Sequence, residues 1–369
     1  MLFSQKRKRI CILQAVNKHV ELGDVNDLNY KTINTKLLSK YRAPLMGVAI
    51  ILIFIFHSAN PIENNAIAEF IRGHCDVGVE IFFLLSGVGC FYSMKKNKTL
   101  QFYKRRLIKL LPPYFFAVLG YLVLTVFIMR SKTVLEVVNN YSLWSLFTNG
   151  SPSVWFISAI LVDYLFAPLI FKALESGRLK VLIIASVGIC IISLLCDYIF
   201  TESVFFTINH LYISRIPIFI LGLILGYSFY YNKSINVNIV FLLLSLIVSI
   251  TALYFVVKFS LGFVLVRIMY APISISGSLI ICKLLDLGKD NIIKKGLASL
   301  GTITLEFYLL HETVSSYVHE AVLPFVYNQI WIANILAFIA SVVVSYLFSI
   351  LVKLFLTLLR KMLKPRKIE

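Results

Sequence analysis

The chain is patterned as a series of long apolar segments separated by short polar stretches. Each segment is near the length of about 20 residues that an α-helix needs to cross a bilayer. The pattern predicts an all-α, polytopic membrane bundle of about ten transmembrane helices, with spans near 44–60, 77–94, 108–129, 154–174, 179–199, 214–231, 237–257, 261–282, 297–318 and 330–359. A basic N-terminal segment (1–40), a membrane domain (41–360) and a basic tail (361–369) then make up the chain.

Composition supports this class and argues against a soluble domain. Hydrophobic residues make up 59% of the chain and charged residues only 15%, and the mean hydropathy is +0.85. The six cysteines are scattered, mostly inside apolar runs and without metal-ligand or redox spacing, which indicates buried small hydrophobic side chains. The first forty residues are basic and polar, so we expect no cleaved signal peptide.

The basic residues indicate the orientation of the chain. Lys and Arg concentrate before the first span, around 95–109, 172–180 and 283–295, and after residue 359. These segments lie on one side of a bundle with an even number of spans, so the positive-inside rule predicts that both termini are cytoplasmic. The same bias accounts for most of the net charge of +18, and no nucleic-acid partner is needed to explain it.

Several ionisable side chains fall into one layer of the predicted bundle. His57 ends the first span, about 20 Å along its helix, where an ionisable group is costly and therefore indicates function. His311 reaches a similar height on the ninth span, and Glu80 lies one turn below the outer edge of the second. Asp163 sits near the middle of the fourth span, and Arg215 enters the sixth from outside. The two histidines and the carboxylate at one depth suggest a shared pocket, although interhelical polar pairs that only hold the bundle together are the alternative.

A series of short motifs resembles those of acyltransferase family 3, the multi-spanning membrane O-acyltransferases. The similarity runs in order from about residue 38 to residue 360. Each motif is weak alone, but their order and spacing are specific. They are Leu45–Ile50 leading to Phe56 and His57, Gly78–Gly87, Tyr103–Tyr114, Trp155–Ser158 with Phe166–Leu169, Arg215–Pro217 with Gly222 and Gly226, and Leu305–His311.

The sequence departs from this family in three places. An arginine often precedes the family histidine by eleven positions, where this chain has Met46. Arg42 lies one turn earlier on the same helical face and is the candidate substitute. The second-span aspartate of the family is Glu80, and its Arg-x-x-Arg pair becomes Arg106 with Lys109, which keeps the charge but loses one bidentate fork.

The resemblance implies acyl-CoA as co-substrate, with acetyl-CoA as the expected donor, supplied from the cytoplasm. Its phosphates need cations on that side, and the candidates are Arg42, Lys104, Arg105, Arg106 and Lys109. The expected catalytic residues are His57, Glu80 and His311. His57 would act as a general base or carry the acyl group itself, and Glu80 would fix its tautomer. We expect no metal.

The resemblance also implies the acceptor, a hydroxyl of a cell-surface glycan or lipid-linked saccharide at the outer face of the inner or plasma membrane. Trp155, Asp163 and Arg215 are the candidate contacts. Any extracytoplasmic or polysaccharide-assembly partner would be a separate protein. Two other functions remain open. A carrier or flippase for a lipid-linked saccharide would transport without CoA, and a non-catalytic component of a polysaccharide export system would not need His57.

Overall fold

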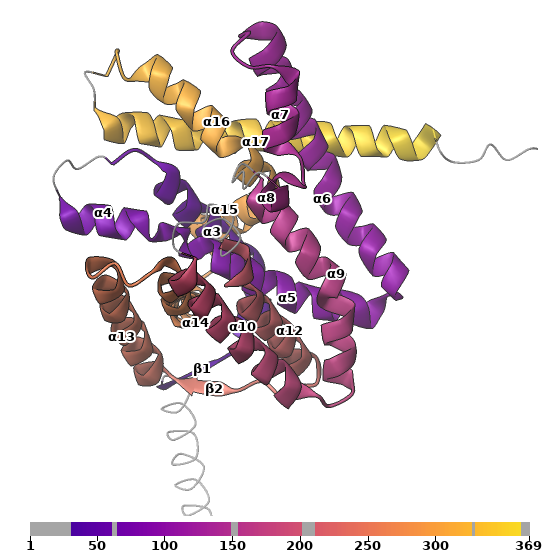
Figure 1. Cartoon of the computed structure of the whole chain (residues 1–369), viewed down its shortest axis with the longest axis vertical. Coiled ribbons are helices and arrows are strands. Elements are labelled where there is room, and N and C mark those ends of the chain that lie inside the picture. Colours follow the sequence, from indigo (N-terminus) through magenta and orange to yellow (C-terminus); the bar gives the residue numbers. More distant parts are fainter. Residues whose placement is uncertain (1–30, 61–64, 149–153, 201–210, 327–328, 363–369) are drawn as a thin grey trace, which may run out of the picture.

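The computed structural model describes residues 31–60, 65–148, 154–200, 211–326 and 329–362. Most of the predicted N-terminal segment (1–40) and of the tail (361–369) lies outside these residues. Helices dominate the described part, which confirms the all-α class (Figure 1). The exception is a two-stranded antiparallel ladder that the apolar pattern did not predict, formed by β1 (Thr32–Asn34) and β2 (Asn236–Asn238). It ties the start of the described chain to the start of α13.

The first part of the chain forms α2 (Leu37–Lys40), α3 (Arg42–His57), α4 (Ala66–Gly73), the 3₁₀ turn η1 (Cys75–Val77), α5 (Gly78–Lys96), α6 (Thr99–Leu122) with its π-helical continuation η2 (Val123–Ile128), α7 (Val134–Tyr141), α8 (Ser145–Thr148) and α9 (Trp155–Glu175). The second part forms α10 (Leu179–Ile199), α12 (Ile216–Tyr230), α13 (Ile239–Lys258), α14 (Phe263–Leu287), α15 (Ile292–Thr302), α16 (Thr304–Val322) and α17 (Ile330–Met362).

Within the described residues, eight helical stretches are long and apolar enough to cross a membrane. They are Ala66–Lys96, Thr99–Ile128, Trp155–Glu175, Leu179–Ile199, Leu211–Tyr230, Ile239–Lys258, Phe263–Leu287 and Ile330–Leu358. The other two expected spans differ. The first is α3, which has only 16 residues, and the segment 297–318 breaks at Ile303 into α15 and α16. The helices that carry His57 and His311 are therefore shorter or more polar than membrane spans.

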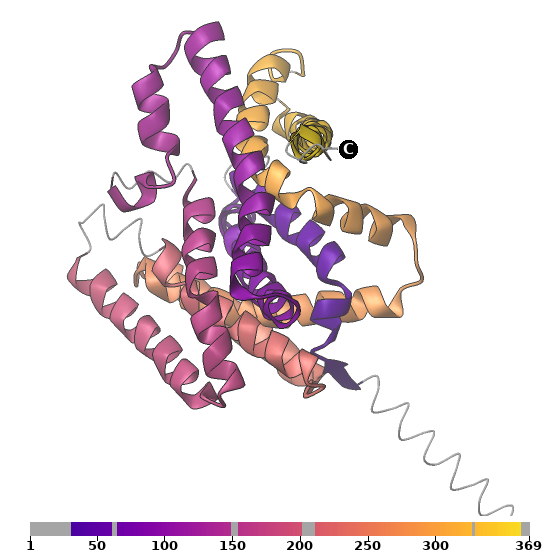
Figure 2. The ribbon, with the colours of Figure 1, turned by 90° about the vertical axis from the view of Figure 1, so that its right-hand side faces the viewer.

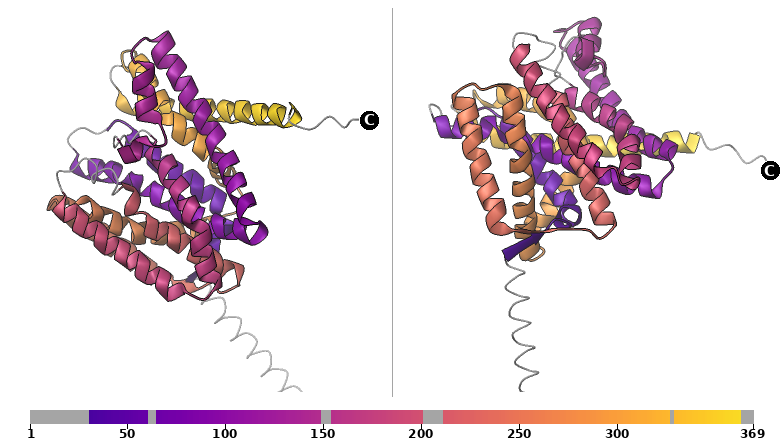
Figure 3. Two further views of the ribbon diagram at one scale, coloured as in Figure 1. Left: turned by 45° about the vertical axis from the view of Figure 1, so that its right-hand side comes forward. Right: turned by 60° about the horizontal axis from the view of Figure 1, so that its bottom comes forward.

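Helix α5 is the centre of the bundle. Of its most apolar stretch, 72% is buried, against 11% for α10, which exposes most of its surface. Its neighbours are α3, α9, α12 and α14. Such an all-round apolar helix fits the interior of a large bundle. Helices α13 and α14 pack side by side at the periphery (Figure 3), where many exposed apolar side chains form a surface suited to lipid.

Close packing against α15 holds α3 in place. A Cβ atom at Gly47 would lie 2.1 Å from the carbonyl oxygen of Leu297, and one at Gly301 would lie 2.0 Å from that of Ala43. Only glycine permits such an approach of two helix backbones. The contact leaves little freedom for the helix that carries His57.

A long final helix, α17, packs against α16 and crosses α6. It runs across the upper part of the molecule in Figure 1 and is seen end-on in Figure 2. A face of small residues repeats every four positions along α17 and is fully or almost fully buried, at Ala333, Ala337, Ser341, Ser345 and Ser349. Small side chains allow close helix packing in a membrane, and α16 with its histidine is thereby fixed between α17 and α3.

Candidate functional site

The two histidines selected from the sequence meet in the structure. His57 ends α3, and His311 lies in the middle of α16 and is fully buried. The Nε2 atom of His311 lies 3.3 Å from Nδ1 of His57, and the ring centroids are 5.0 Å apart. The similar height predicted for the two residues therefore corresponds to direct contact.

The surrounding backbone decides which ring nitrogens carry protons. Nδ1 of His311 lies 2.9 Å from the carbonyl oxygen of Tyr308, and Nδ1 of His57 lies 2.9 Å from that of Ile53. A carbonyl oxygen only accepts, so we assign the proton of each neutral ring to Nδ1. Nδ1–H of His57 then also points at the lone pair of His311 Nε2. This assignment leaves Nε2 of His57 with a free lone pair.

A carboxylate that sequence reasoning missed faces this Nε2 atom and accepts a hydrogen bond from it once Nε2 is protonated. Oε1 of Glu312 lies 3.1 Å from Nε2 of His57. We expected Glu80 against the imidazole, but in the structure Glu312 contacts His57 and Glu80 faces Arg215. Glu312 directly follows His311 in the chain and therefore has nearly the same predicted depth. That depth was the signal in the sequence that could have identified it. The Glu312 side chain is 63% exposed and that of His57 is 32% exposed, so both are accessible to a substrate.

Glu80 instead belongs to a buried network of charges between α5, α12 and α14. Its Oε1 lies 2.8 Å from Nε of Arg215, and both side chains are almost fully buried. Asp76 in the turn η1 before α5 pairs with Arg267 and accepts a hydrogen bond of 2.7 Å from the Tyr270 hydroxyl. Two carboxylates thus face two guanidinium groups, a pairing that buried charges require. Sequence reasoning did not select Asp76, Arg267 or Tyr270.

Among the residues expected to contact an acceptor, Asp163 and Arg215 are buried and Trp155 is half-buried. The guanidinium of Arg215 lies over the Trp155 ring, 4.9 Å from its centroid. Asp163 is 3% exposed, and its Oδ2 has no hydrogen-bond partner among the described residues. Trp155, Asp163 and Arg215 are absent from the lining of the two cavities described next. Arg215 and Trp155 instead connect the ion network to the start of α9.

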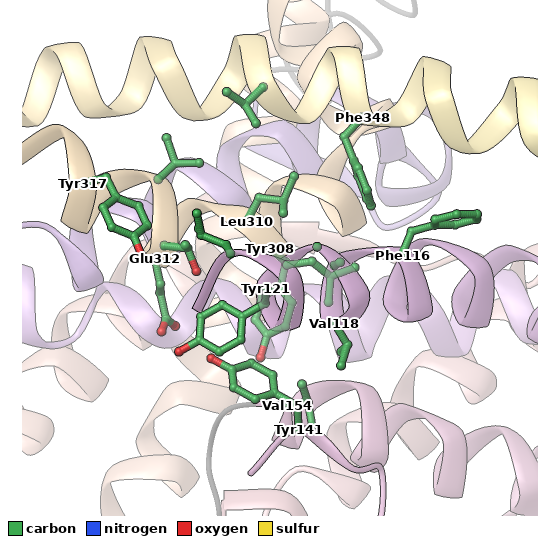
Figure 4. A pocket seen from close by; sticks show the side chains of 17 residues that line it. Phe116, Val118, Tyr121, Tyr141, Val154, Tyr308, Leu310, Glu312, Tyr317 and Phe348 are labelled. Carbon is green, nitrogen blue, oxygen red and sulfur yellow. The ribbon is translucent and has the colours of Figure 1, made fainter. Parts of the chain in front are cut away.

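Two cavities near the histidines are relevant to the site. The larger of this pair has a volume of about 320 Å³ and is rich in tyrosine (Figure 4). Glu312 lines it together with Tyr121, Tyr141, Tyr308 and Tyr317. The rings of Tyr121 and Tyr141 pack at 4.5 Å between centroids. Apolar side chains of α6, α16 and α17 complete the wall. The cavity therefore combines flat apolar surfaces with phenol groups and one carboxylate, and its Glu312 contacts His57.

A second cavity of about 80 Å³ contains the basic residues. Arg42, Arg106 and Lys109 line it, with Met46 and Tyr308 among the neighbours. The guanidinium groups of Arg42 and Arg106 both lie beside Gly89 on α5. Arg42 and Met46 thus line the same cavity, so Arg42 lies close to the position where the family arginine is missing. Tyr308 lines both cavities and separates them.

The basic residues at the start of α6 lie on different faces of the helix. Arg106 and Lys109 are three positions apart and share one face, which points into the smaller cavity. Lys104 and Arg105 are exposed and do not line that cavity. The sequence grouped all four residues by charge, whereas in the structure only Arg106, which is half-buried, and Lys109, which is also exposed, line the smaller cavity.

Comparison with known proteins identifies the chain. The model of the acyltransferase domain called Acyl_transf_3 matches residues 45–354, which is more than half of the sequence. No similar protein was found among curated proteins, and none among solved structures. The matched range contains α3 almost from its start, both histidines, the lining of both cavities except Arg42, and most of α17. The chain therefore belongs to acyltransferase family 3 and is a multi-pass membrane acyltransferase.

Proposed function

We propose that the protein transfers an acyl group, expected to be acetyl, from cytoplasmic acyl-CoA to a hydroxyl of a cell-surface glycan or lipid-linked saccharide. The transfer would take place in the inner or plasma membrane. The observation that carries this proposal is the environment of His57. Its Nδ1 is held by the Ile53 carbonyl and His311, and its Nε2 faces Glu312 at the edge of a cavity.

This arrangement suits base catalysis of acyl transfer. His57 Nε2 takes the proton of the acceptor hydroxyl while the hydroxyl oxygen attacks the thioester carbonyl carbon. The C–S bond then breaks, and the CoA thiolate takes the proton from His57. Once Nε2 is protonated, its N–H donates a hydrogen bond to Glu312, and this carboxylate stabilises the imidazolium. In a second possible order His57 Nε2 attacks the thioester first, releases CoA, and passes the acyl group to the hydroxyl.

The smaller cavity is the proposed entrance for the donor. Its volume of about 80 Å³ suits a slender pantetheine chain rather than a nucleotide. Arg42, Arg106 and Lys109 would bind the phosphates at its mouth, because guanidinium groups grip phosphate with two parallel hydrogen bonds. Tyr308 stands between this cavity and the larger one, so a thioester that reaches Tyr308 comes close to the histidine pair.

The larger cavity is the proposed acceptor site. Sugar rings present apolar C–H faces and hydroxyl edges, and tyrosine offers both an aromatic face and a hydroxyl. The volume of about 320 Å³ lies at the lower end of the range for small-molecule sites. A saccharide unit bound there would place a hydroxyl near Glu312 and His57.

The proposed function is tested by comparing surface glycans and lipid-linked saccharides from cells with and without the gene by mass spectrometry. We expect an O-acyl ester that is present only with the gene, and label transfer from acyl-CoA by the purified protein in nanodiscs. Saccharide movement across the membrane without CoA would instead indicate a carrier.

Substitution of the cavity-lining arginine should weaken donor binding. We expect Arg106→Gln to raise the acyl-CoA concentration for half-maximal rate by roughly ten- to a hundredfold, the loss for a hydrogen bond to a charged group. The effect should shrink at high salt, because screening already weakens phosphate contacts. The matched control is Arg105→Gln, which removes the same charge from the exposed neighbour. Equal effects of the two variants would contradict the assignment.

The orientation proposed from the basic residues places the loop after α5 in the cytoplasm and the segment after η2 outside. Lys98 and Arg130 are exposed at these places. With all six cysteines replaced, Arg130→Cys should react with an impermeant thiol reagent in intact cells, and Lys98→Cys only after permeabilisation. Labelling of Lys98→Cys from outside would reverse the orientation and the donor assignment.

A further inference from the structure

His57, His311 and Glu312 form a group of possible metal ligands. Each offers one ligand atom, and these atoms all lie within 4.8 Å of one another. Two imidazoles with one carboxylate are a common set of ligands for divalent transition metals, whereas Mg²⁺ and Ca²⁺ prefer oxygen ligands alone. A small movement of the exposed Glu312 side chain would bring the three atoms around one ion.

The second shell of this group already has the arrangement of a metal site. A metal-binding histidine usually donates its other N–H to a carbonyl or carboxylate, which fixes the ring and its tautomer. Here Nδ1 of His311 contacts the Tyr308 carbonyl oxygen at 2.9 Å, and Nδ1 of His57 contacts that of Ile53 at 2.9 Å. Nε2 of His57 is therefore left as a lone-pair donor, and the lone pair of His311 Nε2 is shared with Nδ1–H of His57 at 3.3 Å until an ion displaces it.

The group is also accessible and electrostatically suited to a cation. Glu312 lines the larger cavity, so an ion in that cavity can reach the group. Within the described residues, Glu312 forms no ion pair with a Lys or Arg side chain, so its charge is not already neutralised. The Arg and Lys residues of the smaller cavity lie beyond Tyr308.

We propose that His57, His311 and Glu312 bind a divalent transition-metal ion such as Zn²⁺, which reversibly inhibits the enzyme. The ion occupies the lone pair of His57 Nε2, and that atom then neither accepts a proton nor attacks a thioester. The inhibition, though not the binding, rests on the proposed role of His57 in acyl transfer.

Binding is tested with Co²⁺, which absorbs visible light when bound by such ligands. Untagged protein in nanodiscs should bind one Co²⁺ per chain, and Zn²⁺ but not Mg²⁺ should displace it. Glu312→Gln, an exposed and conservative change, should weaken binding at least about tenfold, since even second-shell changes cost ten- to a hundredfold. The matched control is His74→Gln, whose ring packs on Phe70 away from this group and which should bind as the unmodified protein does.

The activity assay then separates this proposal from the proposed function. Zn²⁺ should block acyl transfer, and a chelator should restore it. If Co²⁺ did not bind, or bound equally well to Glu312→Gln, the metal site would be overturned. Acyl transfer by the unmodified protein would then show that the proposed function stands without it. Co²⁺ binding lost in Glu312→Gln would support the site even if no acyl transfer were detected, in which case the proposed function would fail alone.

Discussion

His57→Ala is expected to abolish acyl transfer. Loss of a general base alone lowers rates by about 10²–10⁴-fold, and the loss should be larger if His57 also carries the acyl group. The side chain is partly exposed and ends its helix, so its removal should leave the packing of α3 against α15 intact. The measurement is label transfer from acyl-CoA in nanodiscs, at matched protein abundance.

A matched control is His74→Ala, which removes a histidine outside both cavities. It should retain activity. Acid-quenched mass spectrometry of the unmodified protein with acyl-CoA distinguishes the two orders of reaction, because only the acyl-carrier order adds the acyl mass to His57. Near-normal product from well-folded His57→Ala would exclude His57 from the chemistry.

Removal of the buried Arg215 is expected to have the second large effect, on stability. Arg215→Met leaves the Glu80 carboxylate buried without its cation, and breaking a buried pair in this way costs about 3–5 kcal/mol. The expected result is a strongly lowered unfolding temperature in nanodiscs, with loss of the monodisperse peak in size-exclusion chromatography.

The double variant Glu80→Gln with Arg215→Met is the decisive comparison. It removes both charges of the pair and leaves Asp76 balanced by Arg267, so most of the lost stability should return. Asp290→Asn, which removes an exposed partner of Lys294, should change little. If the double variant were no more stable than Arg215→Met, the pair would not be the source of the effect. If it were stable and fully active, Glu80 would have no catalytic role.

The sequence alone was sufficient for the class of fold and for the meeting of the histidines. Lipid offers no hydrogen-bond partners to the backbone, so apolar runs of the right length must be helices. Because a helix rises by a fixed length per residue, the position of a residue in its span predicts its depth in the membrane. This calculation placed His57 and His311 at a similar height. The family motifs came from the same segments, and the match over residues 45–354 confirms the family.

The sequence was less informative where a helix is interrupted for a local reason. The break at Ile303 lies two residues after Gly301, which packs against α3, and the end of α3 at His57 lies four positions before Pro61. The apolar pattern continues through both places and therefore did not show either interruption. The β1–β2 ladder joins residues about 200 positions apart, a pairing that no local pattern contains.

Only the tertiary structure decided which partner each ionisable side chain meets. Depth pointed to Glu80 as the partner of the imidazole and missed Glu312, and charge alone left Arg105 and Arg106 as equal candidates for the donor. The rotation of each helix resolves both choices, since Glu80 turns toward Arg215 and Arg106 into the smaller cavity. In a helix that is apolar on every face, the hydrophobic pattern carries no direction, so that rotation is fixed only by packing against its neighbours.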